Sequence, residues 1–90
     1  MKILKVVYDN DSKFILDIVK SIDRKFYLET YNISNYKEKK KALPIMTRQG
    51  TKLVPLVVFE NENLEEIDVI WSENAPDWKT EIIKKFDELF

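Results

Sequence analysis

The polar residues best placed to do chemistry form one short cluster, Asp9-Asn10-Asp11-Ser12-Lys13, directly after an apolar run. A serine beside two carboxylates and a lysine has the groups that a nucleophilic or acid–base site needs. The chain of 90 residues contains no histidine and no cysteine. The usual general base and the most reactive nucleophile are therefore missing, and carboxylates, lysines or tyrosines would have to replace them.

The composition narrows the classes of function further. Without cysteine the chain cannot form disulfides, thiolate zinc sites or iron–sulfur clusters, and we expect no cofactor. The net charge is -1, from 15 basic and 16 acidic side chains, so nothing attracts the chain as a whole to nucleic acid or an anionic membrane.

The distribution of apolar residues predicts a cytoplasmic protein. No run approaches the roughly 20 apolar residues of a membrane helix. The start, Met1 to Asp9, carries lysines inside its apolar run and makes a poor signal peptide. We expect one globular domain spanning residues 1–90, either a monomer or a weak homodimer, with no nucleic-acid or membrane partner.

Two further charged groups have a functional and a plainer interpretation. The four lysines between Lys37 and Lys41 could hold a phosphate backbone, but Glu38 interrupts them and a solvated helix face is favoured. The four glutamates between Glu60 and Glu66 could bind calcium or do acid–base work. Charges that discourage pairing at a sheet edge are the favoured explanation for them.

The hydrophobic periodicity predicts the strands and helices around the polar cluster Asp9–Lys13. A Val-rich strand is predicted from Ile3 to Tyr8. Asp11 or Ser12 then caps a helix with an apolar stripe from Phe14 to Ile22. The alternating, aromatic and β-branched segment from Phe26 to Ile33 predicts a second strand.

The middle of the chain predicts a broken helix. Asn35, followed three residues later by Glu38, resembles a capping box and starts a helix through Ala42. Pro44 should end that helix or begin a second helical piece through Arg48, with Gly50 as the stop.

The last part of the chain predicts an antiparallel hairpin and a helix. The strands run from Leu53 to Phe59 and from Glu65 to Trp71, and a loop at 72–76 leads to a helix beginning at Asp77. The order β-α-β-α-β-β-α predicts an α/β fold, with a mixed four-stranded sheet and helices on both faces.

This order and the segment from Gly50 to Phe59 resemble the thioredoxin and glutaredoxin family. The spelling Val54-Pro55-x-Val57 is especially similar to glutaredoxins. The resemblance implies a thioredoxin-like fold over essentially the whole chain. It also implies a cis Val54–Pro55 bond and backbone groups of Val54 that contact an extended peptide or glutathione. A trans bond at the start of a strand is the alternative.

The chain departs from the family where the active-site cysteines belong, at the start of the first helix. Ser12 is the best positional substitute, but a serine cannot exchange disulfides and no histidine is present to activate it. We expect a redox-inactive domain, without dithiol oxidoreductase activity, that holds a peptide, protein or small ligand. The alternatives are a non-redox enzyme that uses Ser12 and a structural homodimer. The candidate binding residues are Asp9, Asn10, Asp11, Ser12, Lys13, Leu53, Val54 and Pro55.

Overall fold

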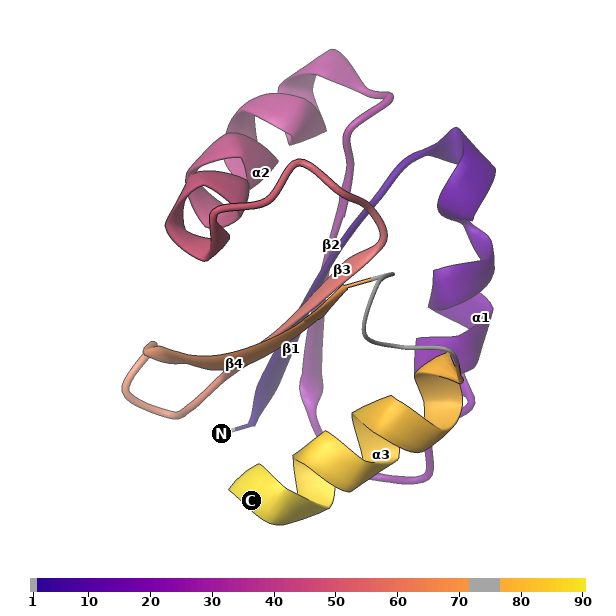
Figure 1. Ribbon diagram of the computed structural model, residues 1–90, viewed down its shortest axis with the longest axis vertical. Coiled ribbons are helices and arrows are strands. Elements are labelled where there is room, and N and C mark those ends of the chain that lie inside the picture. Colours follow the sequence, from indigo (N-terminus) through magenta and orange to yellow (C-terminus); the bar gives the residue numbers. More distant parts are fainter. Residues whose placement is uncertain (1, 72–76) are drawn as a thin grey trace.

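The computed structural model describes residues 2–71 and 77–90. Four strands form one mixed sheet in the spatial order β2-β1-β3-β4. Helix α2 covers one face of this sheet, and α1 and α3 lie side by side on the other (Figure 1). The elements are β1 (Ile3–Tyr8), the 3₁₀ turn η1 (Asn10–Ser12), α1 (Phe14–Lys20), β2 (Tyr27–Asn32), α2 (Tyr36–Gln49), β3 (Leu56–Glu60), β4 (Glu66–Trp71) and α3 (Trp78–Leu89).

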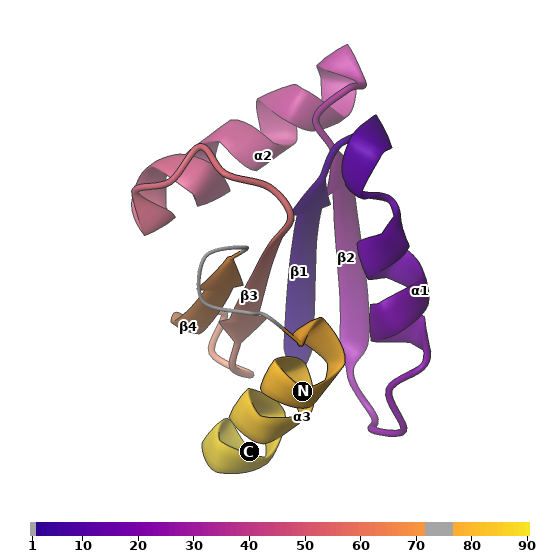
Figure 2. The same cartoon turned by 45° about the vertical axis from the view of Figure 1, so that its right-hand side comes forward.

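The pairing of the strands confirms the predicted mixed sheet. Strands β1 and β2 are parallel and are joined through α1, with Ile3 opposite Tyr27 and Tyr8 opposite Asn32. Strand β3 runs antiparallel to β1, and β4 closes the hairpin antiparallel to β3. Figure 2 shows β1 and β3 in the centre, which explains why both are almost continuously apolar.

Alternate residues of the central strands supply two separate apolar clusters, as the two-residue period of a strand requires. Both clusters are built on β1 and β3. The cluster under α1 and α3 contains Leu4, Val6, Tyr8, Ile15, Val19, Ile22, Val57, Phe59, Ile70, Ile82 and Phe86. The cluster under α2 is smaller and contains Val7, Ala42, Ile45, Met46, Leu56 and Val58.

Helix α2 is continuous through Pro44, so the predicted break there is wrong. A proline inside a helix removes one amide donor and crowds the preceding turn. Burial on both sides of it offsets this cost, since Ala42 before the proline and Ile45 and Met46 after it pack on the sheet. Gly50 ends the helix in the left-handed conformation, with φ 67°, as predicted.

The start of α2 differs from the predicted capping box in one bond. Asn35 caps the helix, and its side-chain oxygen accepts hydrogen bonds from the amides of Lys37 and Glu38 at 3.0 and 3.2 Å. The Glu38 carboxylate accepts a bond from the amide of Asn32, at the end of β2, at 3.3 Å. The side chain of Glu38 thereby ties the helix to the sheet.

Strand β3 begins at Leu56, three residues later than predicted. Pro55 has no amide hydrogen and cannot donate to the ladder, so the segment before it forms a loop. The predicted loop at 72–76 lies outside the described residues. Asp77 caps α3 as predicted, and its carboxylate accepts a hydrogen bond from the amide of Thr80 at 3.2 Å. Over 2–71 and 77–90, no helix is long and apolar enough to cross a bilayer.

Candidate functional site

The two segments predicted to form the site lie at the same end of the sheet, one after β1 and the other before β3. Val7 in β1 lies opposite Leu56 in β3, so Asp9 follows β1 at the end of the sheet where Pro55 precedes β3. Ile33, after β2, lies at the same end of the sheet and donates its amide hydrogen to the carbonyl of Tyr8 at 2.8 Å. The sheet thus brings together the two candidate segments and adds a third from the end of β2.

Asp9 and Ser12 cap each other around the turn η1. The Ser12 hydroxyl donates to Asp9 Oδ1 at 2.7 Å and accepts from the amide of Asp9 at 2.9 Å. The amide of Asp11 also donates to Asp9 Oδ1, at 3.1 Å. Ser12 is only 6% exposed. Asp9 therefore caps η1, and the Ser12 hydroxyl completes a capping box. The predicted cap of the following helix by Asp11 or Ser12 is wrong, because α1 begins after Lys13 without a side-chain capping bond.

Asn10 ties this turn to the end of β2 through side chains that the sequence analysis did not single out. Its amide donates to Ser34 Oγ at 3.0 Å, and its side-chain oxygen accepts from the side-chain amide of Asn32 at 3.0 Å. Only the parallel pairing of β1 and β2 brings these residues, more than 20 positions apart, into contact. Asp11 and Lys13 project from the turn as exposed charges.

The loop before β3 combines a buried proline with an exposed leucine and an unpaired backbone. Pro55 is buried, and the Val54–Pro55 peptide bond is cis. Leu53 is 42% exposed, and its amide donates to Thr51 Oγ1 at 3.0 Å. Within residues 2–71 and 77–90, neither the amide nor the carbonyl of Val54 has a hydrogen-bond partner. These backbone groups are available to a ligand.

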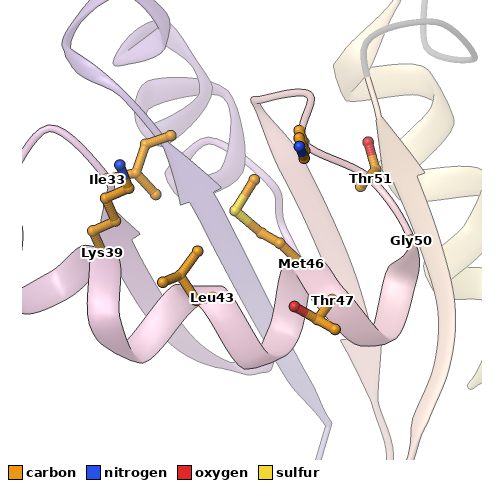
Figure 3. A pocket seen from close by; sticks show the side chains of 8 residues that line it. Ile33, Lys39, Leu43, Met46, Thr47, Gly50 and Thr51 are labelled. Atoms are coloured by element: carbon orange, nitrogen blue, oxygen red, sulfur yellow. The ribbon is translucent and has the colours of Figure 1, made fainter.

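A groove of about 550 Å³ lies on the other side of this loop, against α2 (Figure 3). Its walls come from Ile33, from α2 and from the start of the loop at Gly50, Thr51 and Lys52. No residue that lines this groove was among the predicted binding residues. The three-residue spacing of Leu43 and Met46, which places both on one side of the helix, was the available signal.

The glutamates near the hairpin are held by cations of the protein itself. Glu60 is 3% exposed and is paired with Lys5. Glu66 accepts hydrogen bonds from Arg48 at 2.9 and 2.7 Å and from Gln49 at 2.9 Å. The bonds from Arg48 lower the pKa of Glu66. Glu66 therefore ties α2 to the sheet, whereas Glu60 joins β3 to β1 within the sheet.

Comparison with known proteins gives matches in structure and none in sequence. No protein-family model matches the chain, and no curated protein matches it. The crystal structure of a thioredoxin from Aeropyrum pernix superimposes with a TM-score of 0.65 and 15% identity, covering 99% of this chain and 75% of that one. The solution structure of a thioredoxin from Thermus thermophilus gives a TM-score of 0.64 and 12% identity, covering 98% and 72%.

Structural matches at identities this low establish the fold and leave the activity open. The strand order β2-β1-β3-β4, the placement of the helices and the two matches agree with one another. The chain, although it contains no cysteine, has the thioredoxin-like fold.

Proposed function

We propose that the protein is a redox-inactive thioredoxin-like domain that binds a peptide or protein partner. The proposed contact surface consists of residues Asp9–Lys13 and Leu53–Pro55, here called the loop surface. The unpaired backbone of Val54 beside the exposed side chain of Leu53 is the observation that carries this proposal.

An extended peptide can supply the hydrogen-bond partners that the backbone of Val54 lacks. A carbonyl of the peptide can accept from the amide of Val54, and a peptide N–H can donate to its carbonyl, as in other modes of strand addition. Each such bond contributes about 0.5–1.5 kcal/mol. Leu53 adds apolar contact, so the loop surface provides a small, shape-dependent binding site.

The geometry of Ser12 disfavours the enzymatic alternative. Its hydroxyl both donates to and accepts from Asp9, and it is 6% exposed. A nucleophile needs an accessible oxygen, whereas the Ser12 hydroxyl is buried and engaged in the cap. Because the chain contains no cysteine, we expect no disulfide reduction in an insulin-reduction assay, and clear turnover of the wild-type protein would overturn the assignment as redox-inactive.

Amide chemical shifts test binding directly. ¹⁵N-labelled protein is titrated with reduced glutathione and, separately, with S-carboxymethylated insulin B chain as an extended peptide. We expect the amides of Val54 and of residues 9–13 to shift with at least one of these probes. Unchanged shifts at these positions, at millimolar probe, would reject the proposal.

Two leucine variants provide a matched control for this titration. Leu53→Asp places a charge on the loop surface, whereas Leu64→Asp makes the same change at an exposed position of the β3–β4 turn. Only Leu53→Asp should weaken the shifts, because only Leu53 belongs to the loop surface. Light scattering on the same samples identifies any contribution from a homodimer.

A further inference from the structure

The groove beside α2 has an apolar floor continuous with the core. Figure 3 shows Leu43 and Met46 rising from α2, with Ile33 opposite them. Met46 belongs to the apolar cluster under α2 and Ile33 packs against that cluster, while Leu43 is 48% exposed at the opening. A volume of about 550 Å³ lies within the roughly 300–1,000 Å³ of small-ligand pockets. The floor thus accepts one or two aliphatic side chains.

The rim of the groove is positively charged. Lys39 from α2 and Lys52 from the loop both line the groove, and both are exposed. In the part of the chain that the structure describes, neither lysine is paired with a carboxylate. Residues 37–52 contain six basic side chains and one acidic side chain, although the whole chain has a net charge of -1. The groove therefore lies in the basic part of a slightly acidic protein.

We propose that this groove binds an acidic peptide segment of a partner protein, with an aliphatic side chain on the apolar floor and carboxylates beside Lys39 and Lys52. This inference rests on the proposed binding function and adds the chemistry of the partner. The loop from Gly50 to Pro55 connects the two contacts, since its first residues line the groove and Val54 presents its free backbone.

Charge complementarity and the shape of the floor select this occupant. Carboxylates beside two unpaired lysines gain Coulomb attraction without breaking an existing ion pair. A nucleic acid would also be attracted by the lysines, but its bases need aromatic or planar surfaces for stacking. The groove offers Ile33, Leu43 and Met46, which are all aliphatic. The floor suits leucine-like side chains.

Three nine-residue peptides, acetylated and amidated, serve as probes in ¹⁵N titrations at low salt and at 150 mM salt. The first has two central leucines flanked by aspartates and glutamates. In the second the acidic residues are replaced by glutamines, and in the third the leucines are replaced by serines. Only the first should shift the amides of Ile33, Leu43, Met46 and Thr51, and its affinity should fall as salt rises.

Charge-reversal variants locate the contact. Lys39→Glu with Lys52→Glu should weaken binding of the first peptide about tenfold, because two ion pairs become repulsive. Lys20→Glu with Lys84→Glu changes the net charge equally, but these exposed lysines lie on α1 and α3, on the other face of the sheet. This control should bind nearly as wild type. Leu43→Gln, at an exposed helix position, should weaken binding without unfolding the protein.

The outcomes separate this inference from the proposed function. Shifts confined to the loop surface and equal for all three peptides would leave the binding function standing and overturn the acidic-peptide site. Equal weakening by both charge-reversal pairs would also overturn it. An oligothymidylate of nine nucleotides that shifts the groove more strongly than the acidic peptide would replace it with a nucleic-acid site. Absence of shifts with every probe would reject both proposals.

Discussion

The two faces of the sheet are built in different ways. The face under α1 and α3 buries an uninterrupted apolar cluster that includes Phe59 and Ile82. The face under α2 has a smaller apolar cluster, and where that cluster ends, Lys5 and Glu60 form an ion pair with little exposure. On the first face, the ion pair between Lys85 of α3 and Asp68 of β4 is partly exposed, whereas on the second face the ion pair beside the apolar cluster is almost buried.

This difference is visible in how each face is covered. Within residues 2–71 and 77–90, two helices pack over the first face, whereas one helix, α2, covers the second and buries Ala42, Ile45 and Met46 there (Figure 1). Arg48 of α2 extends the cover by holding Glu66 of β4. A face covered by one helix keeps an open groove and charged groups, so it is the face on which binding can evolve without loss of the main core.

The largest expected effect is a loss of stability that differs between variants on the two faces of the sheet. Phe59→Ala should lower the free energy of unfolding by about 3–5 kcal/mol, because a fully buried ring leaves a cavity under α1 and α3. Leu43→Ala, at the groove, should cost less than ~1 kcal/mol since that side chain is already 48% exposed. Urea unfolding followed by circular dichroism measures both. Equal losses of stability for the two variants would contradict the proposed difference between the two faces of the sheet.

A second prediction concerns the ion pair on the α2 face. Lys5→Met should destabilise the protein by about 3 kcal/mol, because Glu60 would remain 3% exposed without its cation. Adding Glu60→Leu should recover most of that loss, since no buried charge then remains. The same urea titrations apply. If the double variant were as unstable as Lys5→Met, the pair would have a role beyond mutual neutralisation.

A smaller effect is expected at the turn before α1. Asp9→Ala should cost about 1 kcal/mol, because the amide of Asp11 and the Ser12 hydroxyl lose their acceptor. Asp9→Asn keeps an acceptor oxygen and should cost less. Thermal unfolding compares the two variants. An equal cost for the two variants would show that the charge of Asp9 matters more than its acceptor oxygen, since both variants remove the charge.

The smallest effect is a pH dependence on the α2 face. Hydrogen bonds from Arg48 lower the pKa of Glu66 below its ordinary value of 4.5, so the contribution of Glu66 to stability is present above that pH. It is lost as the pH falls through the pKa of the folded state. Glu66→Gln should therefore flatten the fall in stability between about pH 5 and pH 3, by under ~1 kcal/mol because Arg48 is half exposed.

Much of the fold could be predicted because local patterns and tertiary packing agree in most of the chain. The alternation of the strands, the stripe of α1, the left-handed stop at Gly50 and the cap at Asp77 all depend on neighbouring residues. The break at Pro44 was predicted wrongly for the opposite reason. Burial of Ala42, Ile45 and Met46 against the sheet outweighs the local preference of the proline.

The features of the candidate site also fall into two groups, those set by neighbouring residues in the chain and those set by tertiary contacts. The lack of cysteine, a polar cap in the turn before α1 and the position of Val54–Pro55 before a strand are evident from the sequence, although Asp11 or Ser12 was predicted as the cap where Asp9 supplies the carboxylate. Tertiary contacts bring Asn10 to Asn32 and Ser34, pair Glu60 and Glu66 with Lys5 and Arg48, and place Ile33 across a groove from α2. The first group involves neighbours in the chain, whose spacing fixes their contacts. The second involves side chains brought together by strand order and helix packing, which no local pattern records.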